Sequence, residues 1–311
     1  MNSIFRKVLI VWVLTLSACT LIPQPFTPQI TPRSAQSTVF GARQLRVLSQ
    51  PDYVKEETVY VADSEMELAM MAKLLFEEGV MLFYFEDRDY AIEKVYDYLD
   101  AIMIHAFKFS MGTKTYTQGD NVIKALDYVK IELYNDQRSV VDGHIDAFIT
   151  QYIPESSVSA QITAINKGLV LETQYDTSIL DLDLSAITDH TSFEAYGLFE
   201  YNTAVCSGYA KAFLGIAEEL SIPAIVVSSN AMNHAWNLVY DGQGWVYVDS
   251  TYNDPIPDKR GRVVTTYLMV DESSLVGGLG GNDGHVFDAD SEDTLSASDY
   301  VAFAQFLYPN P

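Results

Sequence analysis

The sequence predicts an α+β fold, in which helices pack on a mainly antiparallel sheet. Apolar residues recur at helical spacing in several segments, 207–220 among them. Two strand-like runs, 235–240 and 244–249, flank the hairpin turn signal Asp241-Gly242. With 311 residues, of which 48% are hydrophobic and 20% charged, the chain can bury a large core.

The N-terminal segment is typical of an export signal. A positively charged start precedes the apolar stretch 8–16, which is too short to span a bilayer. Leu16-Ser17-Ala18-Cys19 then resembles the bacterial lipoprotein box, which predicts a signal peptide over 1–18 and a lipid such as palmitate on Cys19. The alternative is an ordinary secretory peptide with an incidental cysteine. We therefore expect an extracytoplasmic lipoprotein, anchored in a membrane through Cys19.

The rest of the chain divides into three parts. Residues 19–57 contain several prolines among Gln, Thr and Ser, and they predict a tether that cannot bury enough apolar surface to order itself. Residues 58–155 predict a smaller α/β region. Residues 156–311 form the predicted main domain, which contains the residues suited to catalysis.

The region 58–155 alternates between helical and strand patterns. Its predicted helices cover 64–78, 89–107 and 139–152, and its predicted strands cover 80–85 and 128–134. Ser64 is a candidate N-cap for the first helix and Gly79 a stop. The many Tyr and Met residues here favour packing over a cofactor site.

In the region 156–311, helices are predicted over 158–173 and 207–220 and a buried strand over 224–228. The hairpin at Asp241-Gly242 puts His234 at the start of one strand and Asp249 at the end of the next. Because the strands of a hairpin are antiparallel, these two side chains should lie side by side.

Cys206 is the second of only two cysteines, so a lipidated Cys19 would leave it without a disulfide partner. It is then either a small buried apolar residue or a nucleophile. Its place in the first turn of a helix would stabilise a thiolate. His234 would act as the base and later protonate a leaving amine, Asp249 would hold the imidazole, and the Cys206 N–H would be one oxyanion donor. The alternative roles are a histidine paired within its strand and an aspartate that caps a turn.

The formal net charge of −23 argues against nucleic acid as a partner, because no cluster of Lys and Arg is present to bind phosphate. Acidity suits an exported protein that must stay soluble, and it could also favour a cationic substrate. His105, His144 and His190 share no metal-ligand spacing, so we expect neither a metal nor a cofactor.

Three motifs resemble those of bacterial transglutaminase-like proteins: Val205-Cys206-Ser207-Gly208-Tyr209-Ala210, His234-Ala235-Trp236-Asn237 and Val248-Asp249-Ser250-Thr251. The likeness extends over about 160–290 and includes Tyr175-Asp176, Tyr196-Gly197-Leu198, Asn253-Asp254-Pro255, Thr266-Tyr267-Leu268-Met269 and a trailing histidine in His285-Val286-Phe287. The resemblance implies a papain-like core, with the cysteine on a helix, the histidine and aspartate on an antiparallel sheet, and Cys206, His234 and Asp249 as catalytic residues.

The sequence also departs from that family in three places. Ser207 stands where many relatives have Gln or Glu, and Asn202 stands where glycine is common. Asn166-Lys167-Gly168 is a weak centre for the helix predicted over 158–173.

We therefore expect an enzyme that forms a Cys206 thioester from the amide of a cell-envelope or extracellular protein or peptide. Hydrolysis by water is the favoured outcome, because a tether would present the site to extracellular material. Two alternatives stay open: acyl transfer to an amine, which cross-links proteins, and a non-catalytic module that binds a peptide in the envelope. The role of His285 does not follow from the sequence.

Overall fold

The computed structural model describes residues 45–47, 58–86, 89–118, 121–134, 136–154, 156–180, 191–254, 256–259, 261–291 and 293–311. The predicted signal peptide 1–18, the lipid site Cys19 and the predicted tether 19–57, apart from 45–47, lie outside the described residues. So does His190.

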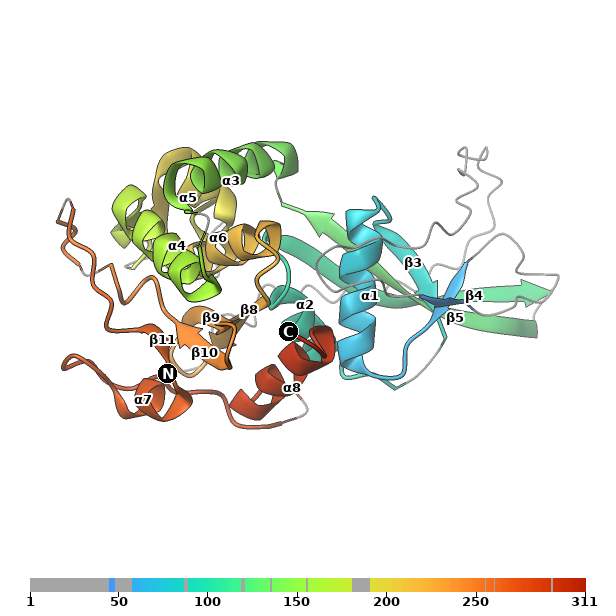
Figure 1. Ribbon diagram of the computed structural model, residues 1–311. Coiled ribbons are helices and arrows are strands. Elements are labelled where there is room, and N and C mark those ends of the chain that lie inside the picture. Colours follow the sequence, from blue (N-terminus) through green and yellow to red (C-terminus); the bar gives the residue numbers. More distant parts are fainter. Residues whose placement is uncertain are drawn as a thin grey trace.

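A five-stranded sheet in the order β1-β2-β3-β5-β4 dominates the N-terminal part. Its strands are β1 (Arg46–Val47), β2 (Val59–Val61), β3 (Leu82–Phe85), β4 (Phe107–Gln118) and β5 (Asn121–Leu133). The long β4–β5 hairpin extends away from the rest of the molecule (Figure 1). Helix α1 (Glu65–Glu77) begins as predicted, because the Ser64 hydroxyl accepts the Glu67 N–H at 3.2 Å.

The predicted helix over 89–107 is wrong at its C-terminal end. Helix α2 (Ile92–Asp100) ends at residue 100, and the chain then turns into β4. Ile102 lies beyond the end of the helix. It is apolar because it is fully buried there, and its position in the sequence happens to continue the helical spacing. The strand β4 was missed altogether, although Phe107 and Phe109 alternate with polar residues as a strand requires.

The C-terminal part packs helices on both faces of a second sheet, in the order β11-β10-β9-β8. These strands are β8 (Ala224–Ser229), β9 (His234–Tyr240), β10 (Trp245–Val248) and β11 (Leu268–Val270). The helices are α3 (Arg138–Tyr152), α4 (Val158–Glu172), α5 (Ala195–Tyr201), α6 (Cys206–Glu219), α7 (Glu272–Gly277) and α8 (Ala297–Leu307). This arrangement confirms the predicted α+β fold.

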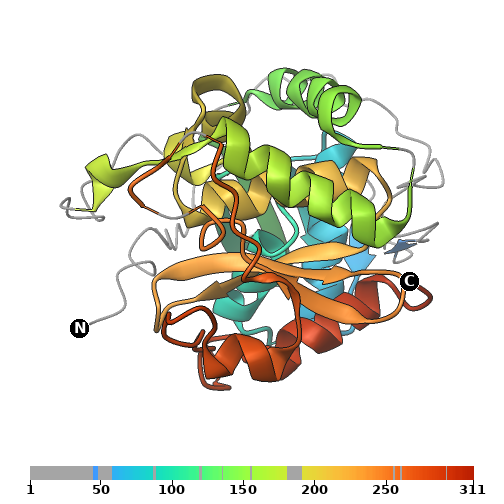
Figure 2. The same ribbon diagram turned by 60° about the vertical axis from the view of Figure 1, so that its left-hand side comes forward.

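Successive buried residues of β8 alternate between the two faces of this sheet. Ala224 and Val226 belong to the apolar cluster that contains α6, whereas Ile225 and Val227 belong to the cluster that contains α8. Figure 2 shows α4 passing over the sheet on one side and α8 (red) lying on the other. Both faces are therefore buried, which explains the nearly continuous apolar composition of β8.

The cluster on the α8 face also includes the apolar side of the N-terminal sheet. Phe85 of β3 and Leu99 of α2 belong to it together with Trp236 of β9 and Phe303 of α8. The ring of Tyr98 in α2 lies 4.6 Å from that of Phe303. The boundary at residue 155 stays a prediction, and the parts on either side of it share one core.

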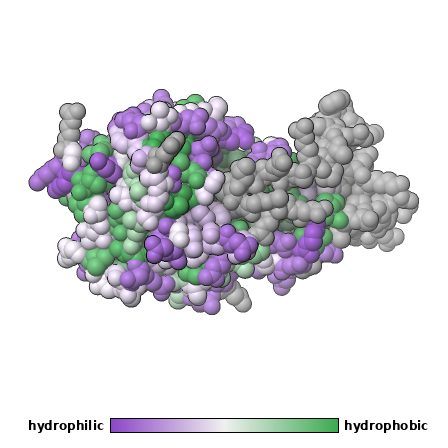
Figure 3. Space-filling view, in the orientation of Figure 1, coloured by the Kyte–Doolittle hydropathy of each residue, from purple (hydrophilic) through white to green (hydrophobic). Residues whose placement is uncertain are grey.

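Polar and apolar residues are interspersed on the face shown in Figure 3. Among the described residues, none of the helices combines the length and the apolar character needed to cross a bilayer.

Candidate active site

Cys206 lies at the first position of α6, and its side chain is almost completely buried. The preceding strand β7 (Thr203–Ala204) pairs in parallel with β6 (Gln174–Tyr175), which fixes the entry into the helix. The N-cap residue Val205 offers no side-chain acceptor to the first turn. The first N–H groups of α6 therefore receive no acceptor from the N-cap side chain, and their dipoles can stabilise an oxyanion at this end of the helix.

The segment before α6 packs closely against its first turn. A Cβ atom on Gly208 would lie 2.7 Å from the Ser192 carbonyl oxygen, so this position requires glycine. The Ser207 hydroxyl donates to the Phe193 carbonyl at 3.1 Å. Ser207 thus binds the backbone of this segment, in the position where many relatives have Gln or Glu.

His234 is the first residue of β9 and follows a tight turn over 230–233. Asn233 has φ +55°, a left-handed conformation that reverses the chain just before the histidine. The Asp288 carboxylate accepts the backbone N–H groups of Asn230 at 2.9 Å and of Ala231 at 2.9 Å. The turn that aims the His234 side chain is therefore held from outside the hairpin.

Asp249 follows β10 directly and has no solvent exposure. Its Oδ2 atom accepts Nε2–H of His234 at 2.7 Å, and its Oδ1 atom accepts the backbone N–H of Tyr252 at 2.9 Å. Since Nε2 of His234 is bound to Asp249, Nδ1 is the nitrogen left for Cys206, which lies close enough to contribute to the raised pKa of the imidazole. The structure thus brings together the three residues that the sequence singled out.

Charge interactions at this site outweigh burial. Burial alone would lower the pKa of His234, but the Asp249 carboxylate and the hydrogen bond to it raise that pKa to about 10. Burial likewise opposes ionisation of Asp249, yet His234 and His285 hold its pKa below the usual range. At neutral pH the site therefore contains an imidazolium between a carboxylate and the Cys206 sulfur.

His285 is a site residue whose role the sequence did not reveal. It is fully buried, and its Nε2–H donates to the same Oδ2 atom of Asp249 at 2.8 Å. His234, Asp249 and His285 are together of the types that can hold a metal ion. Both Nε2–Oδ2 distances are hydrogen-bond lengths, so in this structure each histidine is hydrogen-bonded to Asp249.

The turn after Asp249 rests on Asn166, at the centre of α4. The Asn166 Oδ1 atom accepts the Ser250 hydroxyl at 3.1 Å and the Asn253 side-chain amide at 3.0 Å, and all three residues are buried. Gly168 in the same helix lets the Phe148 ring approach, because a Cβ there would lie 2.4 Å from it. The weak helical composition around Asn166 therefore serves the site and the packing of α4.

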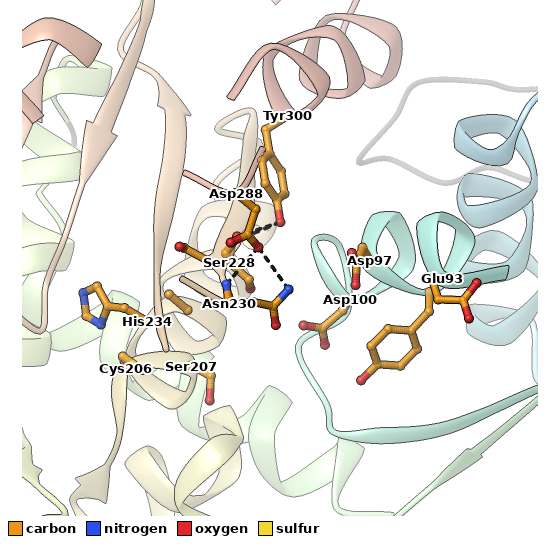
Figure 4. Close-up of a pocket in the computed structure, with 13 residues that line it drawn as sticks. Glu93, Asp97, Asp100, Cys206, Ser207, Ser228, Asn230, His234, Asp288 and Tyr300 are labelled. Atoms are coloured by element: carbon orange, nitrogen blue, oxygen red, sulfur yellow. Dashed lines mark hydrogen bonds between the residues drawn. The ribbon is translucent and has the colours of Figure 1, made fainter. Parts of the chain in front are cut away.

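A cavity of about 190 Å³ opens beside Cys206 and His234 (Figure 4). One wall comes from α2, with the side chains of Glu93, Tyr96, Asp97 and Asp100. Asp100 also forms an ion pair with Lys211 of α6 at 2.7 Å, which ties this wall to the cysteine helix. The N-terminal region thus forms part of the pocket at Cys206.

Helix α6 with Cys206 and the antiparallel sheet with His234 and Asp249 form the papain-like core that the sequence predicted. Residues 147–250 match the family model of the transglutaminase-like superfamily, and this range includes Cys206, His234 and Asp249. This part of the chain is therefore a transglutaminase-like domain, as the sequence motifs predicted.

Two solved structures are similar to the chain. One is a TGase, with 16% identity and a TM-score of 0.36 over 64% of this chain and 65% of that one. The chain thus matches just under two thirds of that protein's length. The other is a candidate cysteine protease from Cytophaga hutchinsonii, with 13% identity and a TM-score of 0.28 over 62% of this chain and 84% of that one. No curated protein matches the sequence.

Proposed function

We propose that this protein is a cysteine acyl-transfer enzyme that cleaves an amide bond in a protein or peptide. The observation that carries the proposal is the hydrogen bond between Asp249 and His234 beside Cys206, where His234 and Cys206 line one cavity. An imidazolium paired with a thiolate is the resting state that such chemistry needs, because the thiolate is the attacking species.

The steps follow from the positions of these groups. The Cys206 sulfur attacks the amide carbonyl, and the backbone N–H of Cys206 stabilises the oxyanion that forms. His234 gives its Nδ1 proton to the leaving amine as the C–N bond breaks, which leaves a thioester on Cys206. His234 then takes a proton from water, the hydroxide attacks the thioester, and the acid product leaves.

The competing outcome is transfer of the acyl group to an amine, which would cross-link two proteins. Both reactions share the thioester and differ only in the nucleophile that reaches it. We favour hydrolysis because a membrane tether, as the sequence predicts, would expose the site to bulk water and to envelope material. A fluorescent primary amine, offered together with an acyl-donor peptide, distinguishes the two by its incorporation.

The test of the shared step is trapping of the acyl-enzyme. Mass spectrometry after incubation with envelope peptides should show an adduct on Cys206, which Cys206→Ala abolishes. Cys206 should also react with iodoacetamide much faster than it does in His234→Ala. Equal alkylation rates in the two proteins would refute the activated nucleophile.

The almost complete burial of Cys206 favours one further reading, a module that binds a peptide in the cavity without cleaving it. Full biological activity of Cys206→Ala would support that reading against the enzyme.

We further propose that Cys19 carries the lipid that anchors the protein at the cell envelope, on the strength of the motif Leu16-Ser17-Ala18-Cys19. A Cys19→Ser strain should release the mature protein from membranes. Retention of the protein in the membrane fraction would count against the anchor.

A further inference from the structure

His285 approaches the site from a segment far along the chain, and its backbone is rigidly held. Its N–H donates to the Leu275 carbonyl at 2.9 Å. A Cβ atom on the preceding Gly284 would lie 1.7 Å from the Val276 carbonyl oxygen, so only glycine allows this close approach. The chain thus delivers one imidazole to the buried carboxylate of Asp249.

We propose that His285 is a positioning residue for the Cys206 site, which acts by fixing the carboxylate of Asp249. The inference rests on the proposed function, in which His234 activates Cys206. His285 donates to Asp249 and is not among the described residues that line the cavity at Cys206, so we expect it to act through Asp249 and His234.

The argument rests on the donors around Asp249. Oδ2 receives Nε2–H of both His234 and His285, and Oδ1 receives the Tyr252 N–H. An ionised carboxylate only accepts hydrogen bonds, so Nε2 of His285 must carry the proton. Three donors from separate parts of the chain hold the carboxylate against rotation about its Cα–Cβ and Cβ–Cγ bonds. This in turn keeps the His234 ring oriented toward Cys206.

The surroundings of His285 fix the direction of its ring. The rings of Trp236, Tyr252 and Tyr267 lie 4.8, 4.9 and 5.0 Å from it. Its Nδ1 atom is buried without a partner among the described residues. A buried polar atom without a partner lowers stability, so packing alone does not explain a histidine here. The Nε2–H of the same ring, which donates to Asp249, does explain it.

Other ionisable groups near Asp249 must stay unchanged in any test. Asp249 interacts electrostatically with Tyr175 of β6 and with Tyr252, and Cys206 interacts with His234. Tyr267 and Asp283 in turn raise the pKa of Tyr252. Substitutions at His285 leave all of these side chains in place.

Two variants separate the donor from the ring. His285→Phe keeps an aromatic ring among Trp236, Tyr252 and Tyr267 but removes the N–H donor. His285→Gln keeps an N–H donor at a similar reach but removes the ring. The readout is the rate of Cys206 alkylation by iodoacetamide as a function of pH, followed by mass spectrometry of the Cys206 peptide, so that no substrate is needed.

We expect His285→Phe to react about tenfold more slowly at pH 7, with the midpoint of its pH–rate curve about one unit higher. His285→Gln should stay within about threefold of the parent protein. His105→Gln, which replaces a buried histidine outside the site, should leave the alkylation curve unchanged.

The opposite order, with His285→Gln slow and His285→Phe normal, would overturn the proposal, as would parental curves in both. If His285→Phe does not fold, His285→Met replaces it as the flexible variant without a donor. The proposed function fails in a different way, since there the parent protein itself would react no faster than His234→Ala.

Discussion

At the scale of single residues, Asp249 determines the protonation of the site. It is fully buried, yet it accepts hydrogen bonds from two imidazoles and one backbone amide. Burial of an unpaired carboxylate would be costly, so these donors are what permits a charge there. The charge of Asp249 then becomes the reason that His234 holds its own proton.

His234 should therefore stay protonated well above neutral pH. Its pKa in the folded protein is raised to about 10, against about 6.5 in the unfolded chain. The stabilisation is complete below about pH 6.5 and is lost as the pH rises through 10. NMR of the imidazole ring should show no titration of His234 between pH 5 and 8.5, and Asp249→Asn should bring its midpoint below about 7. A parental midpoint near neutrality would contradict this assignment.

Asn202 illustrates a residue whose identity follows from backbone geometry. It ends α5 with φ +54° and ψ +33°, the left-handed conformation that glycine adopts most easily. Glycine would therefore fit this position as well as asparagine does.

Asn202→Gly should leave the free energy of unfolding within a few tenths of a kcal/mol, whereas Asn202→Ala should lower it by about 1 kcal/mol. Urea unfolding of the three proteins measures both differences. Equal losses for Gly and Ala would show that the Asn side chain, and not the backbone conformation, matters.

The sequence predicted the three central residues because each has a local signal. Cys206 is at a helix start, and His234 and Asp249 are at the two ends of a hairpin with a clear turn. The part played by His285 could not be predicted, because 36 residues separate it from Asp249 and no periodicity links them. The same holds for Asn166, whose partners lie more than 80 positions away along the chain.

At the scale of elements, α4 supports the turn that follows β10. Asn166→Leu removes the acceptor of the Ser250 and Asn253 side chains and leaves two buried donors without a partner. We expect a loss of about 2–4 kcal/mol in unfolding free energy, together with slower alkylation of Cys206, because Asp249 begins this turn.

A matched control lies one residue away. Ile165→Val shortens a fully buried side chain of the same helix and should cost about 1 kcal/mol without any change in Cys206 reactivity. A normal alkylation rate in Asn166→Leu would show that the turn after β10 does not affect the reactivity of Cys206.

Helix α2 and strand β4 are two elements that the sequence pattern did not predict correctly. Buried Ile102 continued a helical period past the true end of α2. Strand β4 pairs with β5 over its whole length, a contact that depends on the partner strand more than on its own composition.

At the scale of the whole molecule, the core joins elements from both sides of residue 155. Tyr98 and Phe303 pack across this junction, one from α2 and the other from α8. The molecule should therefore unfold as one cooperative unit.

Tyr98→Leu and Phe303→Leu, singly and combined, should show a coupling of about 1 kcal/mol in a double-mutant cycle. Tryptophan fluorescence, which reports Trp236 and Trp245, should change together with far-UV circular dichroism in all four proteins. Two separate transitions in the parent would show that the halves unfold independently.

His105 should make the folded protein sensitive to acid. Burial, with Lys73 and Lys211 nearby, lowers its pKa to about 4. The unfolded chain binds a proton near pH 6.5 while the folded chain resists it, so stability falls between about pH 6.5 and 4. Asp254, whose pKa burial raises to about 6, changes stability in the opposite direction over that range.

The contribution of His105 is therefore measured as a difference between proteins. The unfolding free energy of His105→Gln minus that of the parent should rise by about 2 kcal/mol when the pH falls from 7 to 4.5. Urea unfolding at the two pH values measures it. If this difference in unfolding free energy were the same at both pH values, the pKa of His105 would be the same in the folded and unfolded protein.

The wall that α2 contributes to the cavity has a consequence for how such proteins diversify. The residues proposed for the chemistry lie within 147–250, the range shared with the superfamily, whereas Glu93, Tyr96 and Asp97 lie outside it. Under the proposed function, the reacting groups and part of the surface that would contact a substrate come from separate stretches of the chain. Under that proposal, exchange of α2 between homologues should change the substrate and leave the reaction the same.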